Sequence, residues 1–355
     1  MSSYGEKIKL TIFGESHGEA IGAVIDGVPA GFRIDMDKVL LQMARRAPGK
    51  DKTATPRLEK DFPSVKSGIL NGVTTGAPIA CVIENTNTRS ADYSNLLNNP
   101  RPGHSDYTAF IKYGGNNDIR GGGHFSGRLT APIVFVGAVL RQILEQKGIK
   151  IAAHISSIGD VKDEPFNPVK IDDTLIDELN KSSFALIDKS KESKMREVVE
   201  NARLDCDSIG GTVECAVVGM PVGVGGPLFD GVEGALAKAL FAIPAVKGVE
   251  FGKGFESSKL LGSVNNDAFE YKNERVVTKT NNCGGILGGI TDGMPIVFKA
   301  AFKPTPSIAK EQETVNLQTE KNDTISVKGR HDPCIVPRAV PVVEAIAAIA
   351  VFDLL

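Results

Sequence analysis

Four of the five histidines of this 355-residue chain stand in turns rich in glycine or proline, and such turns often carry functional side chains. They are His17, His104, His124 and His331. An imidazole, with an ordinary pKa of about 6.5, can take up or release a proton near neutral pH. The fifth, His154, lies in an apolar run, and we expect it to be buried with its hydrogen bonds satisfied. No pair has the i, i+4 spacing of a helical metal site and HExxH is absent, so we predict acid–base or phosphate-binding histidines and no metal site.

Basic side chains gather beside the same turns, although the whole chain carries a formal charge of −2. The guanidinium group of arginine suits phosphate and carboxylate groups. We therefore predict one deep site for a phosphorylated or polycarboxylate ligand. The negative net charge argues against partners such as nucleic acid or an anionic membrane. The basic residues are Arg45, Arg46, Lys50, Lys52, Arg57, Arg101, Arg120, Arg128, Lys303, Arg330 and Arg338.

Glycine-rich segments stand next to these basic residues. The stretch GGGHFSGR (121–128) precedes a long apolar run, and 284–289 and 303–307 have the composition of further backbone cradles. Glycine lets the backbone approach a ligand closely and adopt positive φ angles, so we expect an anion-binding loop docked onto a buried helix. The chain has no GxxxxGK[ST], no GxGxxG after its first strand and no GxSxG. These absences disfavour a Walker loop, a Rossmann dinucleotide site and a serine hydrolase.

Alternating or apolar runs between turn residues predict the elements that position these side chains. Predicted helices run from Asp35 to before Pro48, from the glycine-rich stretch to Gly148, over 232–243 and along the apolar C-terminal run. The polar segments 47–63 and 85–117 are predicted to be long loops and are candidates for lids. Residues 160–203 are predicted to form surface helices with one buried stripe of Met195, Val198, Val199 and Ala202. The predicted strands are 7–13, 20–26, 78–84, 149–158, 212–218 and 295–302.

Two segments of the chain resemble each other. A strand, the sequence DGVPAG (26–31) and a helix recur as a strand, the sequence VGMPVG (218–223) and a helix. We hypothesise a duplicated half-domain, which a common strand order in both halves would support and an unrelated order would exclude. No linker rich in glycine, serine or proline separates the halves, so we predict one interleaved α+β domain over residues 1–355.

The cysteines and apolar segments indicate a cytoplasmic protein. The five cysteines (81, 206, 215, 283 and 334) are widely spaced without CxxC, which is typical of reduced thiols. The first residues lack the long apolar run of a signal peptide. The C-terminal apolar run contains Glu344 and is shorter than the ~20 residues of a membrane span, so we predict a buried helix.

Ten motifs, in order and spread over nearly the whole chain, resemble those of the chorismate synthase family. They are FGESHG (13–18), DGVPAG (26–31), RRAPG (45–49), RPGHSD (101–106), GGGHFSGR (121–128), DSIGG (207–211), AVKGVEFG (245–252), GGILGG (284–289), KPTPSI (303–308) and GRHDPC (329–334). The resemblance implies a shikimate-pathway lyase that converts 5-enolpyruvylshikimate 3-phosphate into chorismate and phosphate by a 1,4-elimination. It also implies a homotetramer, a central β–α–β sandwich in each subunit, and a need for reduced FMN without net redox change.

The resemblance also assigns roles to residues. It implies that His104 serves the leaving phosphate, that His17 keeps the reduced flavin in its protonation state, and that Asp332, with Ser16 and Ser126, helps the flavin to take the substrate proton. Substrate contacts carry over to Arg45, Arg46, Lys52, Arg128 and Arg338, of which Arg46 and Lys52 could equally contact a nicotinamide. FMN contacts carry over to His124, Phe125, Ser126, Pro244, Ala245, Gly288, Lys303, Pro304, Thr305, Pro306, Ser307 and Arg330.

The chain departs from the family pattern in three places. HFSGRL (124–129) stands where many members have RSSARE, so Ser126 and Arg128 are kept while His124 and Phe125 are changed. Ala47 and Lys52 stand in place of arginines near a helix end, and Pro244 replaces a usual asparagine. We expect His124 to bind phosphate more weakly than arginine and with a dependence on pH.

The sequence leaves two other functions open. One is a flavin oxidoreductase with net electron transfer, and the other is a non-catalytic sensor of phosphorylated metabolites. The presence of His17, His104, Ser126 and Asp332 favours the lyase, because a pure binding protein has no need of both histidines. No nicotinamide-binding motif is visible, so we expect an external flavin reductase to supply reduced FMN.

Overall fold

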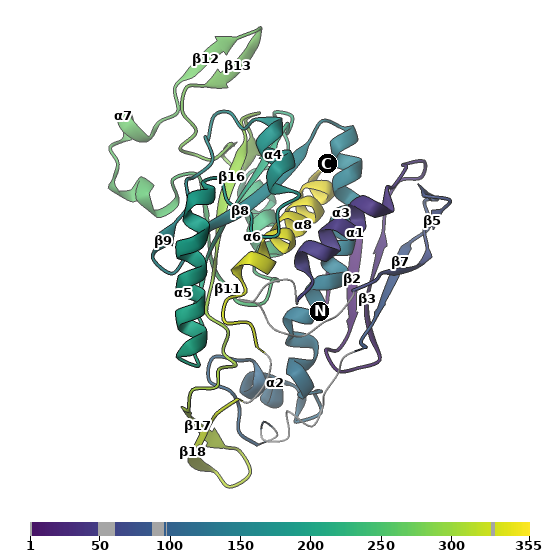
Figure 1. The fold of residues 1–355 in the computed structure, drawn as a ribbon. Helices are drawn as coiled ribbons and strands as arrows, with labels where there is room; N and C mark the ends of the chain where they lie inside the picture. Colours follow the sequence, from purple (N-terminus) through teal and green to yellow (C-terminus); the bar gives the residue numbers. More distant parts are fainter. Residues whose placement is uncertain (1, 49–60, 87–95, 97, 328–330) are drawn as a thin grey trace.

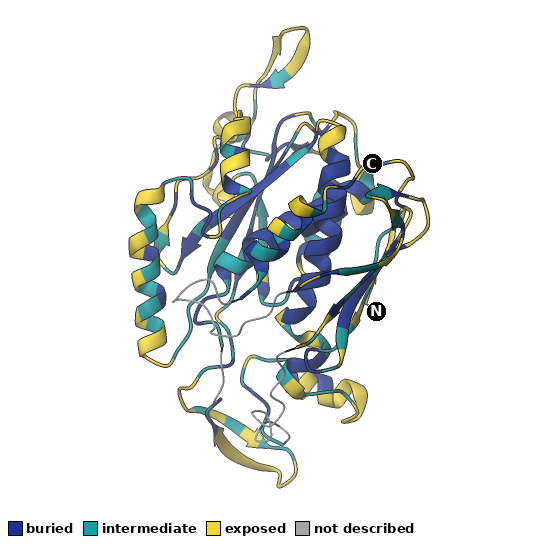
Figure 2. Cartoon of the chain, turned by 45° about the vertical axis from the view of Figure 1, so that its right-hand side comes forward, coloured by how far each residue is buried: buried dark blue, intermediate teal, exposed yellow. Residues whose placement is uncertain are grey.

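The computed structural model describes residues 2–48, 61–86, 96, 98–327 and 331–355. Two five-stranded antiparallel sheets form the outer layers, and helices fill the space between them (Figure 1). Figure 2 shows that burial is concentrated on these inner helices and on the sheets that cover them, whereas the projecting hairpins are exposed. The predicted α+β fold with a central β–α–β sandwich is confirmed.

The first sheet has the strand order β1–β2–β3–β7–β4, and each neighbouring pair is antiparallel. In β7 the residues Ile79, Cys81 and Ile83 are buried and alternate with more exposed ones, as the period of a strand requires. The helix α3 (Thr130–Gln146) packs on β3 and β7, and α1 (Met36–Arg46) packs on α3. The strands are β1 (Ser3–Tyr4), β2 (Lys9–Gly14), β3 (Ala20–Asp26), β4 (Ser64–Ser67) and β7 (Ile79–Glu84).

The second sheet has the order β11–β16–β10–β8–β9 and is also antiparallel throughout. The helix α8 (Val336–Leu354) packs on β8 and β10, and α6 (Val232–Leu240) packs on α8 and β11. The predicted C-terminal helix is therefore confirmed as a buried element. The strands are β8 (Lys150–Ile158), β9 (Val161–Lys162), β10 (Gly211–Val218), β11 (Val246–Phe251) and β16 (Ile296–Phe302).

The two halves of the chain share one topology. Without the edge strands β1 and β9, the sheets run β2–β3–β7–β4 and β8–β10–β16–β11, and both are in the order first, second, fourth, third along the chain. A helix joins the second strand to the third (α1, α6) and another follows the fourth (α3, α8). Gly27 and Gly219 occupy equivalent turns with φ angles of 88° and 87°, and lie against Lys7 and Gly148, just before the first strand of their own half. The duplicated half-domain is confirmed.

The helices α3 and α8 form the centre of the core. Every residue from Thr130 to Leu144 is buried, as is every residue from Ala339 to Phe352, because each helix is covered by a sheet and by its counterpart. Among the described residues one helix, Gly127–Gln146, is long and apolar enough to cross a membrane, yet 94% of its most apolar window is buried inside the protein. Its composition is that of a core helix covered on all sides.

Three elements differ from the expectations drawn from the sequence. The strands β4 and β11 were not predicted, and the predicted loop 85–117 contains the helix α2 (Asp106–Tyr113). Surface helices α4 (Asp173–Leu179) and α5 (Glu192–Leu204) do occupy the region 160–203, although only Met195 and Val199 of the predicted stripe are fully buried. Most of the predicted loop 47–63 lies outside the described residues.

Smaller elements lie outside the two main sheets and the helices between them. A carboxylate on α8, Asp353, accepts hydrogen bonds of 2.8 to 3.0 Å from the N–H groups of Glu6, Lys7 and Ile8, so the last helix is tied to the segment before β2. The other short elements are the hairpins β5–β6 (Ile69–Leu70, Val73–Thr74), β12–β13 (Phe269–Lys272, Arg275–Thr278), β14–β15 (Ile286–Leu287, Ile290–Thr291) and β17–β18 (Gln312–Asn316, Lys321–Ile325), the helix α7 (Gly262–Asn265), and the 3₁₀ turns η2 (Arg120–Phe125), η3 (Gly127–Leu129), η4 (Lys189–Lys191), η5 (Leu228–Asp230) and η6 (Gly254–Lys259).

Candidate active site

A pocket of about 570 Å³ lies where equivalent parts of the two halves meet. The C-terminal ends of α1 and α6 line it, and so do the segments that lead into α3 and α8. The turn 101–105 and the segment 302–307 supply further walls. The lining includes Arg46, Arg101, His104, His124, Phe125, Ser126, Arg128, Pro244, Ala245, Lys303, Thr305, Pro306, Ser307, His331, Asp332 and Arg338. The structure thus brings together most of the predicted site residues.

The glycine stretch allows two histidines to approach one short piece of backbone. Gly121, Gly122 and Gly123 have φ angles of 61°, 94° and 53°, which side chains with a Cβ rarely adopt. A Cβ on Gly122 would lie 3.2 Å from Nε2 of His104, and a Cβ on Gly121 would overlap the ring of His17. A side chain at Gly121 or Gly122 would displace a histidine, so the positive φ predicted for this loop is confirmed and has a steric reason.

His17 and Ser16 lie one layer behind the pocket. Both are buried, and Ser16 N–H donates to the carbonyl of Gly123 at 3.1 Å. Neither lines the pocket, but Ser16 Oγ is 2.9 Å from the place where a Cβ of Gly121 would stand. That buried hydroxyl has no hydrogen-bond partner among the described residues. The glycine stretch therefore separates this pair from His104.

His104 is held by a carboxylate of its own turn. Its Nδ1 is 2.5 Å from Oδ1 of Asp106, and Oδ2 of the same carboxylate accepts from Nε of Arg101 at 2.7 Å. Burial lowers the pKa of His104 below its ordinary value, and the charges of Arg101 and Lys303 act in the same direction, whereas Asp106 opposes them. Although burial alone would raise the pKa of Asp106, hydrogen bonds from Arg101 and His104 hold it well below its usual range. Asp106 is therefore ionised beside the ring at neutral pH.

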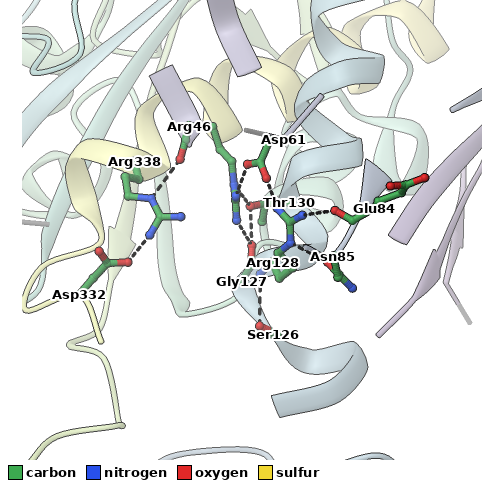
Figure 3. Close-up of polar contacts among 10 residues, drawn as sticks. All are labelled: Arg46, Asp61, Glu84, Asn85, Ser126, Gly127, Arg128, Thr130, Asp332 and Arg338. Atoms are coloured by element: carbon green, nitrogen blue, oxygen red, sulfur yellow. Dashed lines mark hydrogen bonds and ion pairs between the residues drawn. The ribbon is translucent and has the colours of Figure 1, made fainter. Parts of the chain in front are cut away.

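Two pocket arginines share one buried carboxylate. Figure 3 shows Arg46 and Arg128 converging on Asp61, with 2.8 Å between Arg46 Nη1 and Oδ2 and a close ion pair between Arg128 Nη1 and Oδ1. Arg46 also donates to Thr130 Oγ1 and to the carbonyl of Gly127. Burial, together with the nearby Arg338 and Arg128, lowers the pKa of Arg46 to about 10. The arginines hold the pKa of Asp61 below its ordinary value in spite of its burial, so Asp61 and Arg46 are both charged at neutral pH.

A second ion pair also lines the pocket. Arg338, near the start of α8, pairs closely with Asp332 and donates from Nε to the backbone carbonyl of Arg46 at 3.0 Å (Figure 3). Arg338 therefore links the start of α8 to the end of α1. Asp332 and Arg338 both line the pocket and carry opposite charges.

The segment after β16 forms a partly polar cradle. Lys303 N–H donates to the carbonyl of Ala245 at 3.0 Å, and its Nζ donates to the carbonyl of Gly103. Ala245 has a φ angle of 73°, which is unusual for a residue with a side chain. The pocket residue Thr305 has a buried hydroxyl without a hydrogen-bond partner among the described residues. Burial lowers the pKa of Lys303.

The three comparisons with known proteins agree. A family model described as chorismate synthase matches residues 8–355. The chorismate synthase of Dehalococcoides mccartyi is 48% identical over 99% of this chain and 96% of its own length, and that of Pyrococcus abyssi is 47% identical over 98% and 96%. A crystal structure of a chorismate synthase superposes with a TM-score of 0.77 at 27% identity, covering 99% of this chain and 92% of that one. The chain belongs to the chorismate synthase family. The resemblance read from the ten motifs is confirmed, and the activity is that of the family, a lyase of the shikimate pathway that forms chorismate for aromatic amino-acid biosynthesis.

Within the chorismate synthase family pattern, the changed residue His124 is engaged inside the protein. Its Nδ1 donates to the carbonyl of Gly14 at 2.8 Å, and its Nε2 is 2.6 Å from Oγ of Ser2. Because a carbonyl only accepts, the proton stands on Nδ1 and Nε2 accepts from the serine. This arrangement leaves no ring nitrogen for a phosphate, contrary to the expectation from the sequence. Its neighbour Phe125, with 39% exposure, lines the pocket.

Besides His17 and Ser16, three described residues that were predicted for the site do not line this pocket, namely Arg45, Gly288 and Pro304. Arg45 is turned into the core, where it donates to Glu344 at 2.6 Å, a carboxylate that also binds Arg141. The prediction that Arg45 binds the substrate is therefore corrected, because Arg45 forms a structural ion pair in the core. Gly288 lies exposed in the turn between β14 and β15 and does not line the pocket. Lys52 and Arg330 lie outside the described residues.

Reasoning from the sequence missed the carboxylates that hold the pocket cations. Asp106 had a usable signal, because it ends the motif RPGHSD only two residues after His104. Asp61 gave no signal, since it stands at the end of a charged segment and belongs to none of the motifs. His154 behaves as predicted, with Nδ1 2.8 Å from Asp163, Nε2 2.9 Å from Glu214 and no exposure.

Proposed function

We propose that this member of the chorismate synthase family binds reduced FMN and 5-enolpyruvylshikimate 3-phosphate together in the 570 Å³ pocket. The observation that carries the proposal is the position of His104, which is held by Asp106 in a pocket that also contains Arg46, Arg128 and Arg338. A substrate with one phosphate and two carboxylates needs several cations around a proton donor. The pocket provides both.

The residues around the cradle fit a flavin. The unpartnered hydroxyl of Thr305 and the basic Nζ of Lys303 can donate to its polar groups, and the apolar face of Phe125 can contact its ring. Pro244, Ala245, Pro306 and Ser307 complete the contacts that we assign to it. Reduced FMN, when bound, supplies transient electron donation that no side chain offers.

The arginines bind and orient the substrate in this proposal. Arg46 and Arg128 are fixed side by side by Asp61, and Arg338 is fixed by Asp332 and by the carbonyl of Arg46. A guanidinium group has five N–H donors, so each arginine keeps donors for an anion after these internal bonds. Arginines whose conformations are already set lose little entropy when the substrate binds.

His104 donates a proton to the leaving phosphate from Nε2. The phosphate gains negative charge as its C–O bond breaks, and a positive imidazolium at this point stabilises that charge. The pKa of His104 is lowered by burial, so the ring is largely neutral at neutral pH. Negative charge beside Nε2 raises the pKa of an imidazole, and the bound phosphate therefore favours the protonated ring when it is needed.

The remaining predicted catalytic residues act around the flavin. Ser126 lines the pocket, and its Oγ accepts from the N–H of Arg128 at 3.2 Å. Asp332 also lines the pocket and takes part in removing the substrate proton. His17 and Ser16 lie behind Gly121, so we propose that they tune the protonation state near the flavin from this second layer.

We further propose a homotetramer in the cytoplasm that depends on an external flavin reductase. Large apolar side chains are exposed outside the pocket, among them Leu228 (89%), Phe229 (98%), Phe255 (81%) and Tyr271 (84%). Contiguous exposed apolar side chains, such as the neighbours Leu228 and Phe229, are typical of subunit contacts. Sedimentation equilibrium tests the tetramer, and a mass equal to one subunit would reject it. NADPH oxidation without added reductase would reject the external supply.

The lyase reaction is tested under anaerobic conditions with reduced FMN and 5-enolpyruvylshikimate 3-phosphate. We expect equal amounts of phosphate and chorismate, with no accumulation of oxidised flavin. His104→Ala should slow turnover by at least about 100-fold and change KM much less. The exposed Thr108→Ala on α2 serves as a control and should keep the rate. No product from the unmodified chain, or an unchanged rate in His104→Ala, would reject the assigned role.

Flavin binding is tested separately by fluorescence titration with oxidised FMN. Lys303→Met removes a charge but keeps most of the side-chain volume, and we expect it to weaken binding by about 10-fold. Lys310→Met, an exposed lysine seven residues further on, is the matched control. Equal affinity of both variants would exclude Lys303 from the cradle.

A further inference from the structure

We propose that Asp106, anchored by Arg101, is a positioning residue that fixes the tautomer and orientation of His104 so that the proton is exchanged at Nε2. The proposal rests on the proposed function of His104 as proton donor. Nothing in the motif resemblance assigned a role to either Asp106 or Arg101. The three side chains form one unit within a single turn, 101–106, at the start of α2.

The distances show which ring nitrogen carries the proton when His104 is neutral. Nδ1 is 2.5 Å from Oδ1 of Asp106 and 3.1 Å from Nη2 of Arg101. An ionised carboxylate only accepts, so the shorter contact requires a proton on Nδ1. Arg101 Nη2 itself donates to Oδ1 at 2.8 Å, so the arginine has its acceptor in the carboxylate. In the neutral ring, Nε2 is then the nitrogen with a free lone pair.

Arg101 keeps Asp106 both ionised and in place. The carboxylate receives three contacts from this one residue, from Nε at 2.7 Å, from Nη2 at 2.8 Å and from the backbone N–H at 3.0 Å. Arg101 and Asp106 are both buried. Breaking such a pair leaves an uncompensated buried charge, so the carboxylate has no alternative position of similar free energy. A fixed acceptor of this kind allows His104 only one ring orientation.

The unit is also fastened to the segment 303–307, which lines the same pocket. Arg101 Nη1 donates to Oγ of Ser307 at 3.0 Å, and Lys303 Nζ donates to the carbonyl of Gly103. The turn that carries His104 is thus tied to the segment that we assign to the flavin. These bonds therefore fix the distance between His104 and the segment 303–307.

The charges that face His104 set the direction of its response to pH. They are Asp106 and Arg101 on its own turn and Lys303 on the facing segment. Asp106 favours the imidazolium, while burial and the two cations disfavour it. Removing the negative charge of Asp106 should therefore lower the pKa of His104 and shift the pH at which turnover fails toward more acidic values.

The test compares Asp106→Asn and Asp106→Glu with the full-length protein in the anaerobic lyase assay. Asp106→Asn has nearly the same shape but no charge, and its amide can also donate to Nδ1. We expect kcat to fall at least 30-fold with KM within about threefold, and the fall in turnover on raising the pH to begin at lower pH. Asp106→Glu should restore part of kcat. In ¹⁵N-histidine spectra, His104, assigned by its absence in His104→Ala, should change from the Nδ1–H to the Nε2–H tautomer in Asp106→Asn.

A double variant separates failure of this inference from failure of the proposed function. If Asp106 acts through His104, His104→Ala/Asp106→Asn should be no slower than His104→Ala alone. A slow His104→Ala together with a fully active Asp106→Asn and an unchanged tautomer would overturn the positioning role and leave the role of His104 intact. A fully active His104→Ala would overturn both. If Asp106→Asn fails to fold, Asp106→Glu decides through its pH profile and ring spectrum, and wild-type values for both would reject the proposal.

Discussion

Gly137 of α3 lies directly against Ala345 of α8, at the point where the two central helices cross. A Cβ built on Gly137 would overlap both Cα and Cβ of Ala345. The neighbouring atoms belong partly to the backbone of a helix that is itself buried, so they cannot move aside without disturbing the core. Glycine is thus required for this close contact between the two halves of the chain.

We predict that Gly137→Ala lowers the free energy of unfolding by about 1–3 kcal/mol through overpacking. Gly234→Ala on α6 is the matched control, because its nearest atom would be 3.8 Å away and its helix would gain up to about 1 kcal/mol from the better helix former. Urea denaturation at equal pH measures both. Stabilisation by Gly137→Ala would show that the helices separate more easily than their packing indicates.

The buried pair of carboxylates around His154 makes stability depend on pH. Burial would lower the pKa of His154, but hydrogen bonds and charges from Asp163 and Glu214 outweigh it and raise the pKa above 6.5. The stabilising contribution of the protonated ring is therefore complete below about pH 6.5 and is lost as the pH rises through the folded-state pKa. We expect the difference in free energy of unfolding between the wild type and His154→Gln to shrink between about pH 6 and pH 9. A difference that grows over this range would contradict the assigned charge state.

Asp61 is predicted to be the counter-charge that permits two arginines to stand side by side in the pocket. Asp61→Asn should lower the free energy of unfolding by about 3–5 kcal/mol, because two buried guanidinium groups lose their shared partner. Inorganic phosphate should then raise the melting temperature of Asp61→Asn more than that of the wild type, since an anion can replace the missing charge. Glu200→Gln, which breaks an exposed pair with Arg203, should change stability very little and show no such response to phosphate. An equal response in all three proteins would argue against the role of Asp61.

The duplicated topology could be predicted because its signal is local. The turns at Gly27 and Gly219 need positive φ in both halves, and this need is visible in the sequence. The third strands, β4 and β11, escaped prediction for a shared physical reason. Each has a shift in register, between Val65 and Ser67 and between Val246 and Gly248, which breaks the alternation of buried and exposed residues that identifies a strand. The helix α2 escaped because it has no apolar face toward the core, with Tyr107, Phe110, Ile111 and Tyr113 all exposed.

The site was predictable to the extent that its residues belong to turns. His104, Ser126 and Asp332 stand in glycine-rich motifs, and the structure gathers all three at one pocket. Arg45 and Arg46 could not be told apart from sequence, because adjacent helical residues point about 100° apart and only the packing decides which faces the pocket. The partners of the cations depend on contacts between distant residues, such as Arg128 with Asp61, 67 positions apart. No local pattern contains that information.

The hydrogen bonds from the N–H groups of residues 6–8 to the carboxylate of Asp353 have a consequence for the connectivity of the chain. These hydrogen bonds join the end of the second half to the start of the first. The equivalent junction in the other direction is Lys147 and Gly148, which join the end of the first half to the start of the second. The two junctions are equivalent, so the order in which the halves follow each other along the chain is arbitrary with respect to the fold. We expect a circular permutant to keep both sheets, both central helices and the pocket between them. Its chain would open between Lys147 and Gly148, and a short flexible linker would join the original C-terminus to the original N-terminus.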